Sequence, residues 1–465
     1  MITAVNFKPH YWSPAYNPIV YSCTSDLSTQ TDMNYVFEVY INQSVTPNLT
    51  LRQRPNPSGV GMIDVSSTLQ PYIDLSLYSV ENDYHPTMYG NSDDILAEIV
   101  YIKVGEEYVD VNGALITEDG YGNPGGPEYP LGNEEGDGTS VIVTPAALPF
   151  QTAINNMGAT ADYVYWSDYI MDGNGKFLSQ DATTRNVYDY DYSTLSFLNW
   201  NNAGASYNSA VQLIQYKQYD DGGSLLRTDN LQNTLGVGGG PQSFDTFITQ
   251  PFNRISTQLS VKTGPANLQD YGIWDSLTAS YTVTAFVKTS ATTATTPGAT
   301  ASQTITYNVQ PDCDQLYPRV RVSWLNELGG RDYWNFTMFY QKVTNSATSE
   351  YFQTPLNWSG VRPVAVQGTD TNLAPNYMRG GSKSFNKTVT QTMEIQTDWL
   401  TQDQVDFLGY ISQSPDVLIY VGDTPTPMTV KVMTIDYTYR LIKQVKLTQA
   451  IYNLQFTKVQ QKQNQ

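Results

Sequence analysis

The feature that most constrains the fold of this chain is a short helix with its own start signals, set between β-rich stretches near the C-terminus. Thr401 and Gln404 form a T-x-x-Q capping box, in which each side chain can satisfy a main-chain amide of the other residue. Leu400 and Val405 have the spacing of the hydrophobic staple that often accompanies such a box. The sequence therefore predicts that a helix begins after Thr401.

The helix has one apolar stripe, which predicts the face that it turns toward a core. Val405, Leu408 and Ile411 recur at helical spacing, and Ser414-Pro415 favours a return to extended chain. Strands are expected at 417–420, near 428–433, and in the final run. In that run, apolar residues alternate strictly with polar ones, which is typical of a half-buried strand; the apolar residues are Tyr452, Leu454 and Phe456.

This order of strand, capped helix, Ser-Pro-Asp-Val strand and closing antiparallel strands, over about 385–465, resembles the C-terminal domain of distal-tail or baseplate proteins of tailed phages, especially phages of Bacteroidota. Stretches elsewhere are similar to the same kind of virion protein: Tyr11–Tyr21, Tyr35–Asn42, Arg54–Gly59 and Val320–Trp334. The resemblance implies a non-enzymatic structural component of the virion. It would be a ring or adaptor subunit of the tail, baseplate or neck, assembled in the host cytoplasm and linking neighbouring tail proteins.

The composition indicates a mainly β protein with several domains. Among 465 residues, 12% are aromatic and only 15% are charged, with 35 Tyr, 33 Gly and 25 Pro, which favours many short strands joined by turns. We expect antiparallel β-sandwiches or barrels, with the one short capped helix in the last domain. The predicted divisions are an N-terminal β-sandwich domain at 1–116, an acidic Gly/Pro-rich linker or loop at 117–140, a Tyr-rich middle domain at 141–310 and a C-terminal domain at 311–465. Within the first domain, Gly105–Glu107 is predicted to be a hairpin tip.

Charge and edge strands bear on the partners. A formal net charge of -19 repels a phosphate backbone, so direct sequence-specific nucleic-acid binding is not expected. No secretory signal is visible and no apolar run reaches the ~20 residues of a membrane-spanning helix, so membrane insertion is not expected. A chain rich in polar β-structure must cover its edge strands, and a cyclic contact between copies does this. We therefore expect a homo-oligomeric ring, with six subunits as the leading possibility.

The motifs for catalysis, cofactors and metals are missing or incomplete. The G-x-S-x-G pattern is absent and the chain has two histidines, which argues against a Ser-His-Asp triad or a zinc cluster. The glycine run 236–241 fails both nucleotide-binding patterns. The segment 172–176 begins like a calcium loop, but Lys176 stands at a ligand position and Phe177 replaces the required glycine, so a turn is expected. No catalytic, cofactor-binding or metal-binding residue is therefore predicted.

One stretch interleaves aromatic rings with carboxylates and is the candidate binding surface. Its rings are Tyr163, Tyr165, Trp166, Tyr169, Tyr188, Tyr190, Tyr192 and Trp200. Such rings can belong to a core, to a subunit interface or to a carbohydrate site, because flat aromatic faces stack on both proteins and sugars. Two alternative functions stay open: a receptor- or carbohydrate-binding protein of the tail or head surface, and a glycoside hydrolase that uses two of the 44 acidic residues.

Overall fold

The structure is a computed structural model. It describes residues 2–7, 12–41, 46–73, 98–118, 141–144, 146–148, 166–169, 171, 173–199, 211–232, 257–270, 272–287, 297–311, 317–353, 381–421, 427–442 and 445–457. The fold is mainly β with several antiparallel sheets, as predicted.

The N-terminal domain is built from two sheets that share one core. Three strands form the smaller sheet in the order β1-β3-β6: β1 (Ile2–Phe7), β3 (Val20–Ser25) and β6 (Val60–Asp64). The larger sheet has the order β2-β9-β7-β4-β5, with β8 paired to β7: β2 (Trp12–Pro14), β4 (Thr31–Ile41), β5 (Leu49–Gln53), β7 (Glu98–Val109), β8 (Leu115–Glu118) and β9 (Val141–Thr144). A short helix α1 (Ser66–Leu69) and a 3-10 turn η1 (Gln70–Tyr72) follow β6. Tyr35, Phe37 and Val39 of β4 are fully buried in this core, as their alternation predicts.

Two details of this domain differ from the sequence prediction. Residues 141–144 fall at the start of the predicted middle domain, but they form β9, which pairs in parallel with β2 and antiparallel with β7 and so completes the first domain. Gly105–Glu107 is not a hairpin tip, since all three residues lie inside β7 and pair with β4. The turn comes later, where the Asp110 carboxylate accepts hydrogen bonds from the amides of Asn112 and Ala114.

The middle domain also places two sheets around one core. A five-stranded sheet has the order β10-β16-β15-β12-β13, and a second sheet pairs β11 with β14. The bounds are β10 (Thr184–Val187), β11 (Thr194–Asn199), β12 (Val211–Tyr219), β13 (Leu225–Gln232), β14 (Thr257–Lys262), β15 (Ser280–Val287), β16 (Ile305–Val309), η3 (Trp166–Tyr169) and α4 (Pro265–Asp270). Tyr281 and Tyr307 are buried and stacked, with ring centroids 4.7 Å apart. Gly223, at φ 78°, closes the β12–β13 hairpin.

The C-terminal domain is a seven-stranded antiparallel sheet that packs against one helix. The sheet order is β18-β17-β21-β22-β23-β20-β19. The bounds are β17 (Val320–Leu325), β18 (Arg331–Phe336), β19 (Tyr340–Gln353), β20 (Gly381–Gln396), α5 (Gln402–Gly409), η6 (Tyr410–Ser412), β21 (Val417–Val421), β22 (Met428–Ile442) and β23 (Val445–Phe456).

The predicted helix is confirmed in its cap and in its buried face. The Thr401 amide donates to Gln404 Oε1 at 3.0 Å, and the Gln404 amide donates to Thr401 Oγ1 at 3.5 Å. Val405 and Leu408 are buried in the domain core, with Leu408 0% exposed. The Tyr452 hydroxyl of β23 donates to the Leu408 carbonyl oxygen at 3.2 Å, which anchors the helix to the sheet.

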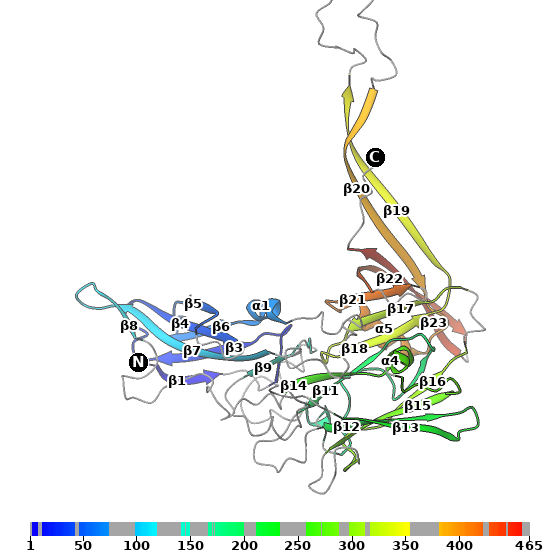
Figure 1. The fold of residues 1–465 in the computed structure, drawn as a ribbon. Coiled ribbons are helices and arrows are strands. Elements are labelled where there is room, and N and C mark those ends of the chain that lie inside the picture. The colour runs from blue at the N-terminus through cyan, green and yellow to red at the C-terminus, as the bar shows by residue number, and fades with distance from the viewer. Residues whose placement is uncertain are drawn as a thin grey trace, which may run out of the picture.

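The outer two strands of this sheet continue past the core as an arm. β19 and β20 pair along their length from Tyr340–Ile395 to Gln353–Gly381 and project away from the packed domains (Figure 1). Every residue of β19 from 341 to 352 is exposed, whereas Met393 and Ile395, near the base of β20, are buried. The arm therefore leaves the core within a few residues of its base.

Candidate functional site

Buried charged side chains gather where the middle domain meets the C-terminal domain. Residues 178–193 of the middle domain face β17 and β18, and β11 lies against β18. Four charged residues are nearly inaccessible here: Asp191, Arg319, Arg321 and Asp332. Burying a charge is costly unless it is paired and hydrogen-bonded, so the partners of these residues determine what the junction can do.

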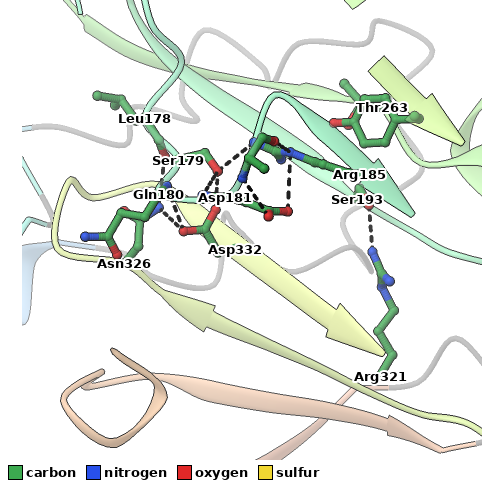
Figure 2. Close-up of polar contacts among 12 residues, drawn as sticks. Leu178, Ser179, Gln180, Asp181, Arg185, Ser193, Thr263, Arg321, Asn326 and Asp332 are labelled. Carbon is green, nitrogen blue, oxygen red and sulfur yellow. Dashed lines mark hydrogen bonds and ion pairs between the residues drawn. The ribbon is translucent and has the colours of Figure 1, made fainter. Parts of the chain in front are cut away.

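One half of the junction is centred on Asp332 at the start of β18 (Figure 2). Its carboxylate accepts hydrogen bonds from the Ser179 hydroxyl and from the Gln180 amide, the latter at 3.1 Å, both from the middle domain. The Asn326 side chain donates to Asp332 at 2.9 Å and to the Leu178 carbonyl oxygen at 3.0 Å. The Asn326 side chain thus hydrogen-bonds both to its own domain, at Asp332, and to the middle domain, at Leu178.

The backbones of the two domains come into direct contact beside Asn326. The Gly330 amide donates to the Asn326 side-chain oxygen at 3.0 Å, which closes the turn between β17 and β18. A Cβ atom added to Gly330 would lie 1.8 Å from the Leu178 carbonyl oxygen. Glycine is therefore required here for the close approach of the two chains.

The other half of the junction is centred on Arg321 of β17. Its guanidinium donates to three groups of the middle domain, the Asp191 carboxylate at 2.8 Å, the Ser193 hydroxyl at 2.7 Å and the Tyr192 carbonyl oxygen at 3.1 Å. Asn335 also donates to Asp191, at 2.6 Å. Planar guanidinium groups suit this fixed set of acceptors, because their donors lie in one rigid fork.

Aromatic faces complete the packing of the two arginines. The guanidinium of Arg321 lies over the Tyr333 ring, 4.9 Å from its centroid, and that of Arg319 lies 4.4 Å from the centroid of Tyr188. The Tyr333 hydroxyl lies 2.9 Å from Thr194 Oγ1 of β11. The Arg319–Tyr188 and Tyr333–Thr194 contacts cross from one domain to the other, so the junction is held by charge, hydrogen bonds and ring packing together.

Burial shifts the acid–base behaviour of two carboxyl groups in this junction. Burial raises the pKa of Asp181 to about 6, although the Arg185 guanidinium 3.3 Å away acts in the opposite direction. Burial also raises the pKa of Asp332. Carboxyl groups with raised pKa values are candidates for general acids. Asp332 is 0% exposed and both of its oxygens accept protein hydrogen bonds, so it cannot contact a dissolved substrate in this arrangement.

The structure divides the predicted aromatic surface. Tyr163, Tyr165 and Trp200 lie outside the described residues, as does the side chain of Trp166, whose backbone is in η3. Tyr169 is half-buried, and burial raises its pKa to about 12.

The tyrosines at 188–192 lie in and beside a tight turn at the edge of the junction. Tyr188 and Tyr192 are half-buried, and Tyr192 packs against Leu418 and Tyr420 of the C-terminal domain. Tyr190 is 55% exposed. Two of the predicted rings therefore contact the neighbouring domain of the same chain, and among these three tyrosines only Tyr190 presents its ring to solvent. The subunit-interface and carbohydrate interpretations stay predictions.

In the segment that begins like a calcium loop, Asp172 lies outside the described residues. Residues 173 and 174 form a bend, and the amides of Gly173 and Gly175 donate to the Ala301 carbonyl oxygen at 3.1 and 3.0 Å. Lys176 stands at a ligand position of the calcium-loop pattern, but its ammonium has no oxygen to offer a calcium ion and donates to the Asp168 carboxylate at 2.7 Å. Across the described ranges, no group of three or more His, Cys, Asp or Glu side chains is arranged to hold a metal ion. Within the same ranges, no helix is long and apolar enough to cross a membrane.

No local sequence pattern predicts the Arg321 and Asp332 networks. Their partners are separated by about 130 to 150 residues in the chain, so no local pattern joins them. Arg321 and Ser323 alternate with Val320, Val322 and Trp324, a pattern that predicts these two polar side chains to face solvent, whereas every residue of β17 is buried.

No protein-family model matches the chain, and no curated protein matches it.

Proposed function

We propose that this protein is a non-enzymatic structural component of a tailed-phage virion, a ring or adaptor subunit of the tail, baseplate or neck that links neighbouring proteins. The observation that carries the proposal is the junction, in which the residues with the chemistry of an active site are committed to contacts between two domains. Arg321 donates three hydrogen bonds to the middle domain, and Asp332 accepts two from it. These contacts would hold the middle and C-terminal domains in a fixed orientation. A fixed orientation suits a subunit that connects two neighbouring tail proteins.

Two further features support the same role. The C-terminal domain has the strand, capped helix and closing strands on which the resemblance to distal-tail and baseplate proteins rests. The arm formed by β19 and β20 exposes a long stretch of strand that an isolated domain does not need for its core. Exposed strands of this kind are surfaces for contact with other chains.

The proposal also covers the expected partners and location. The chain would form a cyclic homo-oligomer, with six subunits as the expected number, and would contact other tail, baseplate or neck proteins. It would assemble in the host cytoplasm and remain in the virion. The acidic charge of the chain suits a passage for DNA, because repulsion would keep the DNA from adhering during ejection.

Cryo-electron microscopy of intact particles of the phage that carries the gene tests the location. The expected result is density for this chain in a ring of the tail, baseplate or neck, with other proteins on two sides. Density at the fibre tips or on the capsid faces alone would instead favour the receptor-binding or head-surface alternative. Absence of the chain from purified particles, checked by mass spectrometry, would refute a virion role altogether.

An activity screen tests the non-enzymatic part separately. The purified chain should release no reducing ends from capsular polysaccharide or peptidoglycan of the host. Release that is abolished by Asp181→Asn, but not by a substitution of Asp229, would establish the glycoside hydrolase alternative.

A further inference from the structure

The C-terminal sheet has one covered edge and one open edge. Its first strand, β18, is covered by the middle domain through β11 and the Tyr333–Thr194 contact. Its last strand, β19, pairs within the described residues with β20 only. In an antiparallel sheet, alternate residues of an edge strand direct their N–H and C=O groups outward, so β19 presents a row of main-chain donors and acceptors.

The usual protections of an open edge are sparse along this strand. The 14 residues of β19 contain no proline and two charged residues, Lys342 and Glu350. The register shift near Glu350 adds a residue to β20 and not to β19, so the alternation of β19 side chains is unbroken. A two-stranded arm that is exposed along its length is marginally stable by itself. Pairing with a further strand would satisfy the open edge.

The positions of the two charges select one partner for this edge. Lys342 and Glu350 are eight residues apart, so their side chains lie on the same face of β19. Within one chain the Lys342 ammonium lies 4.8 Å from the Phe456 ring centroid and the Glu350 carboxylate accepts a hydrogen bond from Ser382, and neither residue forms an ion pair with another described residue. If a second β19 runs antiparallel to the first and the two are centred on Ser346, Lys342 of one copy stands opposite Glu350 of the other, and the reverse pair forms as well. A parallel pairing in register would set Lys342 against Lys342 and Glu350 against Glu350, which is unfavourable.

The remaining pairs in this register also fit. Thr344 stands opposite Thr348 of the second copy, and threonine pairs across strands are favourable. Tyr340 stands opposite Phe352, whose side chain is 73% exposed in the single chain. An aromatic pair at each end would cover this exposed ring.

From these matches we infer that β19 is a self-complementary dimerisation strand, which joins two copies of this chain by antiparallel pairing centred on Ser346. The contact is isologous, because the same strand serves in both copies. It converts two arms into one four-stranded sheet. At ~3.4 Å per residue, the bases of the two arms are about 40 Å apart, which leaves room for both bodies.

This contact is separate from the proposed virion role. An isologous pair relates two copies by a twofold axis, so it does not close a ring by itself. It would join two single copies or, if the chain forms rings, two rings face to face. The contact does not depend on which other proteins the chain binds in a particle.

Charge reversal tests the register directly. The variant Lys342→Glu sets its new carboxylate against Glu350 of the second copy, and Glu350→Lys sets its new ammonium group against Lys342. Each repulsion occurs twice in the symmetric contact, so each single variant should weaken pairing by at least about tenfold. An equimolar mixture of the two single variants should restore it, because every facing pair is then one of opposite charge.

The measurement is sedimentation velocity of the full chain over a concentration series. The mass of the wild-type assembly should halve in each single variant, and return in the mixture and in the double variant Lys342→Glu/Glu350→Lys. Two matched controls make the same charge changes on β20, away from the edge: Lys383→Glu and Glu394→Lys should keep the wild-type mass. Circular dichroism of each variant checks the fold.

Three outcomes would overturn the inference. The first is a wild-type chain that stays monomeric throughout the series. The second is an assembly whose mass is unchanged by the single variants, or lost equally in the β20 controls. The third is a mixture of the two single variants that does not recover the wild-type mass.

Discussion

Replacing Arg321 by methionine tests whether the junction makes the middle and C-terminal domains one unit. Methionine keeps an unbranched apolar side chain over Tyr333 but removes three hydrogen bonds to the middle domain. Asp191, whose side chain is 4% exposed, then loses its nearest cation. Removing one partner of a buried ion pair costs about 3–5 kcal/mol. Asn335 still donates to Asp191 and Arg319 lies 3.7 Å away, so we expect the lower end, about 3 kcal/mol.

Differential scanning calorimetry gives the readout, because it separates domains that unfold independently. In the wild-type protein the middle and C-terminal domains should share one transition, and in Arg321→Met that transition should move to lower temperature or divide in two, while the N-terminal transition stays as an internal reference. Arg52→Met is the matched control, since Arg52 pairs with Glu107 at the surface and is 58% exposed. We expect it to cost no more than about 1 kcal/mol. If both variants have the same small effect, the junction does not join the domains.

Three further changes probe the C-terminal domain and the junction. Leu408→Ala should destabilise the C-terminal domain by about 2–5 kcal/mol, because it leaves a cavity in the core. Thr401→Ala should cost only about 1 kcal/mol, because it removes the helix cap. Equal and negligible changes in the urea midpoint of both variants would contradict the packing of the helix. Gly330→Ala should separate the transitions of the two domains in calorimetry, because its Cβ would collide with the Leu178 carbonyl oxygen; a wild-type profile would disprove the close approach. Burial raises the pKa of Asp181 to about 6, so its contribution to stability is complete below about pH 4 and is lost as the pH rises through 6. Asp181→Asn should therefore remove up to about 3 kcal/mol of the fall in stability between about pH 4 and 7, measured by urea titrations in a pH series; an unchanged pH profile would show that Asp181 is equally charged in the folded and unfolded states.

The sequence predicts the parts of the fold whose signals are local. The capping box correctly predicts where α5 begins, because both of its hydrogen bonds join residues only three positions apart and therefore leave a local sequence pattern. Alternation identifies the buried faces of β4 and β15, since the period of two follows from strand geometry alone.

Other parts depend on contacts that no local pattern encodes. Gly105–Glu107 has the composition of a turn, yet β4 on one side and β8 on the other hold Glu106 and Glu107 in a strand. The arm has exposed residues on both faces of β19, so the alternation of apolar and polar residues that marks a strand is missing there. The junction joins segments about 130 to 150 residues apart, and only the folded chain brings them together.

The position of β9 has a consequence for the order of events during synthesis. β9 lies between β2 and β7, so residues near the start of the chain reach the larger sheet only through a strand that begins at Val141. A ribosome delivers the chain from the N-terminus, so β4, β5 and β7 can pair with one another as they emerge. β2 must wait, and the edge of β7 at 98–100 stays open, until residue 144 has left the exit tunnel. During that interval the nascent first domain exposes unpaired strand, which makes it a substrate for chaperones and a point at which two nascent chains on one messenger can exchange strands.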